Sequence, residues 1–67
     1  MEHITKNILR EIKSSNKPHK KIADELGVSK QVVSDYIAGR SLPSIQTLIK
    51  LCKVLNCTYE DILGPLV

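Results

Sequence analysis

The sequence predicts an all-α fold, organised as one compact bundle of five short helices. Apolar residues recur at helical spacing, and no segment shows the sustained alternation of apolar and polar residues that is typical of a strand. Residues suited to helix ends divide the chain into five segments. With 67 residues, 42% of them hydrophobic and none of them Trp or Phe, the chain has room for one small core of Ile, Leu and Val.

Two helices are expected in the first part of the chain. The first spans residues 3–15 and ends at the polar stretch 14–16. Its inward-facing residues are Ile4, Ile8, Leu9 and Ile12. Pro18 suits the first turn of the second helix, because the N–H that proline lacks would have no helical partner there. This second helix runs to about Leu26, and its inward-facing residues are Ile22, Ala23 and Leu26.

The charges of the second helix run against its dipole. Basic residues gather at its start and acidic residues near its end: Lys17, His19, Lys20 and Lys21, then Asp24 and Glu25. Two i,i+4 pairs are expected in the weaker orientation, Lys20 with Asp24 and Lys21 with Glu25. A basic helix N-terminus becomes favourable when an anion docks on its free N–H groups, so this end is a candidate phosphate contact. The alternative is an ordinary solvated face.

The third expected helix follows a tight turn at Gly27 and covers the segment from Lys30 to Gly39. Ser29 is a good N-cap because its hydroxyl can accept from a first-turn N–H, and Gly39 tolerates the left-handed conformation that ends a helix. One face is apolar: Val32, Val33, Tyr36 and Ile37. The other face is polar or small: Lys30, Gln31, Ser34, Asp35 and Ala38. We expect the first face to be buried and the second to contact a partner.

Two further helices are expected toward the C-terminus. Ser44 caps the fourth, which follows the loop 40–43 and ends at Asn56. Its inward face is expected to comprise Ile45, Leu48, Ile49, Cys52 and Leu55, with Leu51 on the rim and Val54 on the polar side. Thr58 caps a short fifth helix with acidic residues in its first turn, and residues 64–67 form a short tail.

The two cysteines do not predict a metal site. Zinc sites need about four clustered ligands. Cys52 and Cys57 are the only cysteines, and His3 and His19 are distant from them in sequence. We therefore expect buried or half-buried structural thiols and no bound metal.

Several functional classes find no support in the residues. No nucleophile with a plausible base, metal cluster or glycine-rich phosphate loop is apparent, so an enzyme, a cofactor and a small-molecule ligand are not expected. No apolar run approaches the roughly 20 residues of a membrane span, and the N-terminus lacks a signal pattern. A cytoplasmic protein without membrane contact is expected.

One ordered series of residues runs through the second, third and fourth helices. It comprises Ile22-Ala23-Asp24-Glu25-Leu26-Gly27-Val28-Ser29, Val33-Ser34, Gly39, Pro43-Ser44, Thr47-Leu48 and Leu55. The series resembles the helix-turn-helix of the phage repressor and Cro superfamily, the lambda-repressor-like or XRE family, over nearly the whole chain. The resemblance implies a single domain over residues 1–67, a helix-turn-helix at about residues 18–39, and a third helix that lies in the DNA major groove.

The turn of this motif has physical requirements that the residues meet. Ala23 is small, so the third helix can cross the second closely. Gly27 tolerates a turn conformation that a Cβ would strain. Val28 and Val33 stiffen the junction from the core side, so the polar face of the third helix is held rigidly outward, as a base-reading surface requires.

The resemblance assigns base reading to Lys30, Gln31, Ser34 and Asp35, because N-terminal residues of a recognition helix penetrate the groove deepest. Lys30 can donate to guanine, and Gln31 can pair with adenine. Asp35 is repelled by phosphates unless it accepts from cytosine or pairs with a neighbouring base-contacting side chain. We expect it to contribute specificity by exclusion.

The resemblance also implies contacts with the DNA backbone, which position a protein without reading sequence. The residues concerned are His19, Lys20, Ser29, Arg40, Ser41 and Ser44. His19 has an equally favoured second interpretation as a half-buried structural histidine, because it lies beside the inward-facing residues of the second helix.

The predicted function is that of a sequence-specific DNA-binding transcriptional regulator, a repressor or a Cro-like switch protein. The net charge of +3 and the isoelectric point near 9.0 are compatible with a nucleic-acid partner. One monomer contacts little DNA, so a homodimer on a pseudo-palindromic double-stranded operator is expected. Candidate dimer residues are Leu51, Val54, Tyr59, Leu63, Leu66 and Val67. For Leu63, Leu66 and Val67 the alternative role is to cover the core.

A different class of function is a protein-interaction module, such as an antitoxin or anti-activator whose main partner is a protein. Asp35 and the modest net charge leave this alternative open. A protein-binding helix would more often present aromatic or aliphatic anchors than the polar face that begins at Lys30.

Overall fold

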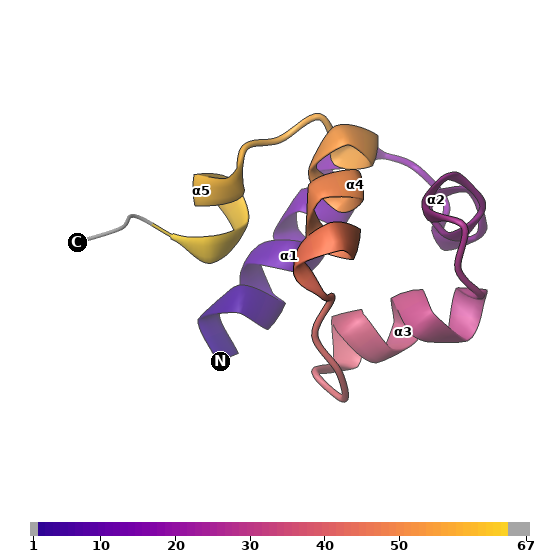
Figure 1. Cartoon of the computed structure of the whole chain (residues 1–67), viewed down its shortest axis with the longest axis horizontal. Coiled ribbons are helices and arrows are strands. Elements are labelled where there is room, and N and C mark those ends of the chain that lie inside the picture. The colour runs from indigo at the N-terminus through magenta and orange to yellow at the C-terminus, as the bar shows by residue number, and fades with distance from the viewer. Residues whose placement is uncertain (1, 65–67) are drawn as a thin grey trace.

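The structure is a computed structural model that describes residues 2–64 (Figure 1). Its helices are α1 (Glu2–Ser15), α2 (His19–Leu26), α3 (Lys30–Ala38), α4 (Ile45–Leu55) and α5 (Tyr59–Leu63). No strand occurs between residues 2 and 64, and the predicted all-α fold of five helices is confirmed. No helix in this range combines the length and apolar composition that crossing a bilayer requires.

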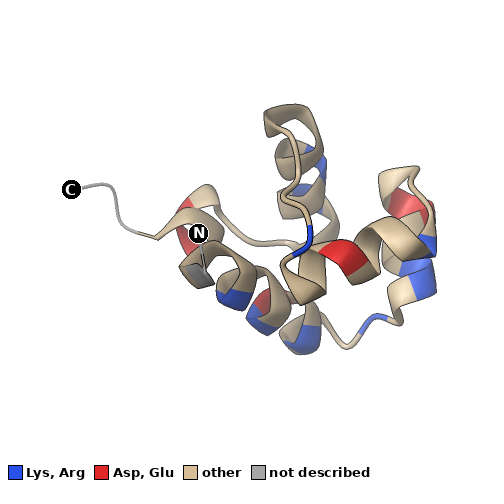
Figure 2. Cartoon of the chain, turned by 90° about the horizontal axis from the view of Figure 1, so that it is seen from below, with Lys and Arg blue, Asp and Glu red and all other residues tan. Residues whose placement is uncertain are grey.

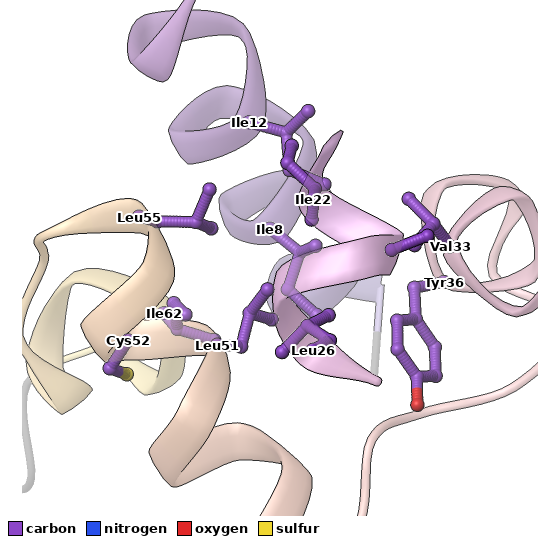
Figure 3. Close-up of a cluster of buried hydrophobic side chains, with 11 residues drawn as sticks. Ile8, Ile12, Ile22, Leu26, Val33, Tyr36, Leu51, Cys52, Leu55 and Ile62 are labelled. Carbon is purple, nitrogen blue, oxygen red and sulfur yellow. The ribbon is translucent and has the colours of Figure 1, made fainter. Parts of the chain in front are cut away.

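All five helices contribute to one core (Figure 3). Its buried residues are Ile8, Ile12, Ile22, Ala23, Leu26, Val33, Tyr36, Leu51, Cys52, Leu55 and Ile62. Helix α1 packs against α3, α4 and α5, whereas α2 packs against α3 and α4. The core therefore lies between α1 and the rest of the chain, and α3 is supported from two sides.

The turn between α2 and α3 has the expected residues in the expected roles. Gly27 adopts φ 75°, in the left-handed region, and the N–H of Val28 donates to the carbonyl of Ala23 at 3.0 Å. A Cβ on Gly27 would meet no neighbouring atom, so the backbone angle rather than space requires glycine here. Ser29 then caps α3 by accepting from the N–H of Val32 at 3.3 Å. These caps fix where α2 ends and where α3 begins.

Pro18 lies one position earlier than expected relative to α2. It precedes the helix in an extended conformation, with φ −61° and ψ 150°, rather than occupying the first turn. Its carbonyl accepts from the N–H groups of Lys21 and Ile22, both at 3.1 Å. The helix therefore starts without a side-chain cap at its N-terminus.

Helix α5 has only five residues and depends on α1 for its position. Thr58 and Asp61 form a capping box at its start. At its end, the side-chain amide of Asn7 donates to the carbonyl of Ile62 at 2.8 Å, and Arg10 donates to the carbonyl of Asp61 at 2.6 Å. Ile62 is fully buried, so packing and hydrogen bonds both hold α5 against α1.

The predicted inward face of α4 was partly wrong: Leu48, Cys52 and Leu55 face the core as expected, but Ile45 and Ile49 do not. Leu51, expected on the rim, is 0% exposed, whereas Ile45 is 78% and Ile49 is 37% exposed. The residues facing the core have i, i+3, i+4, i+7 spacing: Leu48, Leu51, Cys52 and Leu55. Apolar residues cover so much of the circumference of α4 that two overlapping stripes fit its sequence. Packing against α1 and α2 selects the stripe that contains Leu51.

The corrected orientation of α4 predicts different costs for two similar truncations. Leu51→Ala removes a fully buried side chain and should lower the free energy of unfolding by about 2–5 kcal/mol. Ile45→Ala, in the same helix but largely exposed, should change it by no more than about 0.5 kcal/mol at protein concentrations low enough to keep the chain monomeric. Chemical denaturation followed by circular dichroism measures both. Equal costs, or a larger cost for Ile45→Ala, would contradict the observed orientation.

Candidate nucleic-acid interface

Helix α3 lies along the edge of the molecule, with α1 and α2 on its inner side (Figure 1). Val33 and Tyr36 are buried, and Val32 and Ile37 are partly buried against the core. Their burial turns the opposite face to solvent, and that face carries Lys30, Gln31, Ser34, Asp35 and Ala38. Lys30 and Gln31 are exposed in the first turn, while Ser34 and Asp35 are partly exposed. The predicted division of α3 into a buried and an outward face is confirmed.

Asp35 connects two exposed side chains of this surface. Its Oδ1 accepts from Nε2 of Gln31 at 3.0 Å and from Nε of Arg40 at 2.8 Å. The N–H of Arg40 also donates to the Asp35 carbonyl at 2.9 Å. The hydrogen bond from Arg40, followed by that from Gln31, lowers the pKa of Asp35 below its usual value. Asp35 is therefore a carboxylate that pairs with neighbouring side chains. Such pairing is one of the two arrangements, with acceptance from cytosine as the other, in which we expected this carboxylate to be compatible with DNA.

The charge arrangement around α2 differs from the expected one. Lys17 does not crowd the start of α2; its Nζ donates to Glu25 at 2.9 Å and to the carbonyl of Val54 at 2.8 Å. Lys17 thus supplies a positive charge near the C-terminal end of α4, where the helix dipole is negative. Within residues 2–64, neither of the two expected i,i+4 ion pairs of α2 forms.

The remaining basic residues at the start of α2 are open to solvent. His19 and Lys20 are exposed, so the alternative of a half-buried structural histidine was wrong. The first turn of α2 contains no acidic residue and its N-terminus has no side-chain cap. Free N–H groups and basic side chains therefore occupy the same end of the helix, an arrangement that suits a phosphate.

Helices α3 and α4 begin in the same way as each other. Ser29 and Ser44 use their hydroxyls as caps, and Ser44 accepts from the N–H of Thr47 at 3.2 Å. Neither first turn contains an acidic residue. Both N-termini are therefore free of the negative charge that would repel a phosphate.

The loop after α3 lies next to the start of α1. An open hollow between them is lined by residues of both, namely Thr5, Lys6, Ala38, Gly39, Arg40, Ser41 and Leu42. Arg40 and Ser41 are exposed, as backbone contacts must be. Lys6 adds a third polar group that the sequence analysis missed. No local pattern marks Lys6, because only the packing of α1 on α3 brings it to this loop.

The candidate dimer residues differ in how far they are buried. Leu51 belongs to the core and cannot reach a partner, which corrects its assignment. Val54 is partly buried, whereas Tyr59 is 51% and Leu63 is 37% exposed. Leu66 and Val67 lie outside the described residues.

Two exposed residues of α4 were missed because the sequence analysis placed them in the core. Ile45 and Ile49 lie one turn apart on α4, and Tyr59 and Leu63 lie one turn apart on α5. Ile49 and Tyr59 also line one open hollow between these helices. We call Ile45, Ile49, Tyr59 and Leu63 the α4–α5 apolar surface.

The hydrogen bonds of Asp35 predict a pH-dependent interaction. In Arg40→Ala, the pKa of Asp35 should rise toward its ordinary value because the main hydrogen bond to the carboxylate is lost. The stabilisation that these hydrogen bonds give the folded protein is fully present above the ordinary aspartate pKa. It disappears as the pH falls through the lowered pKa of Asp35 in the folded protein. NMR titration of the carboxyl carbons measures the pKa of Asp35 in the parent and in Arg40→Ala. Asp61, whose pKa is lowered first by the Thr58 N–H, is the internal control. An unchanged Asp35 titration would contradict the pairing.

Comparison with known proteins places this geometry in a family. A family model described as helix-turn-helix matches residues 8–62. The chain is 28% identical over 61 residues to the cryptic phage CTXphi transcriptional repressor RstR of Vibrio cholerae serotype O1 (strain ATCC 39315 / El Tor Inaba N16961), an alignment that covers 91% of this chain and 54% of the relative. The chain thus spans about half the length of that curated relative. No solved structure matches the chain. The match over most of the chain, together with the α2–turn–α3 geometry, shows that this protein belongs to the XRE-type helix-turn-helix family.

Proposed function

We propose that this chain is a sequence-specific DNA-binding repressor or Cro-like switch protein that reads the major groove with α3. The observation that best supports this function is the exposed polar start of α3, a helix that the buried side chains of Val33 and Tyr36 fix to the core. Membership in the helix-turn-helix family supports a DNA-binding transcriptional regulator. The name of the relative, a transcriptional repressor, supports repression.

Gln31 is oriented for base reading before any DNA is bound. Only its amide NH₂ can donate to the Asp35 carboxylate, so the hydrogen bond fixes which end of the amide faces Asp35. The carbonyl oxygen and the second N–H remain free. These are the acceptor and the donor that pair with N6 and N7 of adenine. Asp35 is therefore a positioning residue in this proposal, and Lys30, which precedes Gln31, is the candidate guanine contact.

Backbone contacts surround this reading surface. Arg40 uses Nε for Asp35, which leaves its two terminal nitrogens for a phosphate. Ser41 and Lys6 line the hollow beside Arg40. On the other side, the uncapped start of α2 carries His19 and Lys20, while Ser29 and Ser44 mark the starts of α3 and α4. These groups would hold the protein on the duplex without reading its sequence.

A protein-interaction module, the alternative function, would bind its partner through a different kind of surface. The α3 surface offers Lys30, Gln31 and Ser34 rather than apolar anchors, which favours DNA. The α4–α5 apolar surface is the part of the described molecule that would suit a protein partner, and we assign it to a second copy of the chain.

Selection of bound sequences from random DNA, at a stated salt concentration, tests the proposal. A motif should emerge, and Lys30→Ala and Gln31→Ala should each relax one position by about 1–3 kcal/mol. Arg40→Ala should weaken binding to all sequences alike and reduce the salt slope by about one unit. Lys13→Ala, an exposed lysine at the end of α1, is the matched control. DNA reading is refuted if no motif emerges and both α3 variants bind as the parent does.

Dimerisation through the α4–α5 apolar surface is the second part of the proposal. A single small domain buries too little DNA surface for tight specific binding, and two copies would occupy half-sites about one helical turn apart. The surface combines i,i+4 pairs from two adjacent helices, and Ile45 at 78% exposed is its most accessible member. Exposed apolar groups that meet their own copy lose contact with water, which drives association.

The dimer surface makes a prediction for oligomeric state. Sedimentation equilibrium at tens of micromolar should show a dimer in which Ile45→Lys or Tyr59→Lys raises the dissociation constant at least about tenfold, because each buries a charge. Leu42→Lys, at a residue 39% exposed outside this surface, should leave the dimer unchanged. A parent protein that remains monomeric both alone and on DNA would rule the surface out.

A further inference from the structure

We propose that Cys52, Cys57, Glu11 and Asp61 form a binding site for one thiophilic divalent cation such as Zn²⁺. The residues come from α1, the end of α4, the following loop and α5. One ligand atom each of Glu11, Cys57 and Asp61 lie within 4.8 Å of one another. Cys52 lies outside this triplet and lines the same hollow as Cys57. Thiolate and carboxylate are both ordinary zinc ligands.

The position of the two cysteines follows from how α4 ends. Asn56 adopts a left-handed conformation, and the N–H of Cys57 donates back to the carbonyl of Cys52 at 3.0 Å. This helix ending brings the side chains on either side of the cap into contact. The thiols of Cys52 and Cys57 are therefore held together by the backbone, although five positions separate them.

The two carboxylates approach from other helices. Asp61 belongs to the capping box of α5, where Oδ2 accepts from the Thr58 N–H at 2.9 Å. Glu11 lies on α1, and its Oε2 accepts from Arg10 at 3.2 Å. Each carboxylate has a second oxygen beyond the one in these bonds, and that oxygen is the candidate metal ligand.

The separation of the ligand atoms fits a metal after a small adjustment. An ion at the centre of three atoms 4.8 Å apart would lie about 2.8 Å from each, which is the largest value that their mutual distances allow. Zinc bonds are about 2.0–2.3 Å long. Glu11, Cys57 and Asp61 therefore each have to move inward by at most about half an ångström to 0.8 Å. Cys52, outside this triplet, has to rotate toward it to become the fourth ligand.

The charges of the cluster favour a cation. Glu11 and Asp61 place two carboxylates beside the Cys57 thiol, and these negative charges attract a divalent cation. Because the metal displaces the thiol protons, its affinity should increase with pH.

The experiment is titration of the reduced protein with Co²⁺ as a spectroscopic probe and with Zn²⁺ against a chelator. One equivalent of Co²⁺ should produce thiolate-to-metal charge-transfer absorption, and Zn²⁺ should displace it. Zn²⁺ should also raise the melting temperature, because it binds the folded state. Proton release on binding, measured in weak buffer, provides a readout that does not depend on colour.

Matched variants separate the site from adventitious binding. Cys57→Ser should abolish the charge-transfer band or reduce it severely, and Glu11→Gln should weaken binding at least about tenfold, because it removes a negatively charged ligand. Glu60→Gln, an exposed acid next to Asp61 and outside the cluster, should bind as the parent does. Asp61 is left intact because it also caps α5. Circular dichroism shows that each variant is folded. Absence of the band in the parent, or equal affinities for Glu11→Gln and Glu60→Gln, would overturn the proposal.

Discussion

The close crossing of α2 and α3 is the constraint on which the rest of the molecule depends. The chain reverses direction at Gly27 with φ 75°, and the turn is closed by the hydrogen bond from Val28 to Ala23. Ala23 is 2% exposed, so no larger side chain fits without moving one helix. The angle set by this turn decides which side of α3 meets the core. That orientation places Lys30 and Gln31 in solvent, on the face that we propose reads DNA.

Local chemistry explains which features of the fold could be predicted from the sequence. Helix ends depend on neighbouring residues, so Ser29, Ser44, Thr58 and Gly39 all mark the ends that the structure shows. The orientation of α4 depends instead on what it packs against. Its apolar residues cover too much of its surface to define one face, and Leu51 was placed on the rim although it is fully buried. Periodicity locates a helix reliably, but it orients the helix only when the apolar stripe is narrow.

The same distinction applies to the candidate site. The pairing of Asp35 with Gln31 spans one helical turn, so the sequence already contained it as an alternative. Three arrangements join residues distant in sequence. Lys17 contacts Val54, Lys6 lines the same hollow as Arg40, and Glu11 lies beside Cys57. Nothing in their own neighbourhoods marks them. Lys17 precedes α2 in the sequence, but in the fold its charge lies at the C-terminal end of α4. The reversal of charge along α2 is therefore weaker than the sequence suggested.

The charged residues are spread over the domain, and some of them stabilise helix ends. Figure 2 shows Lys and Arg on several helices rather than gathered on one. Arg10 and Lys17 are engaged with carbonyls of α5 and α4, where they stabilise helix ends. The modest net charge therefore overstates the charge free for DNA, and binding must rely on well-placed groups such as Arg40. The α4–α5 apolar surface rests half on α5, a five-residue helix that α1 holds in place. In the dimer that we propose, a partner that covers Tyr59 and Leu63 would add to those contacts, so the pairing of two copies would stabilise the packing of α5 on α1.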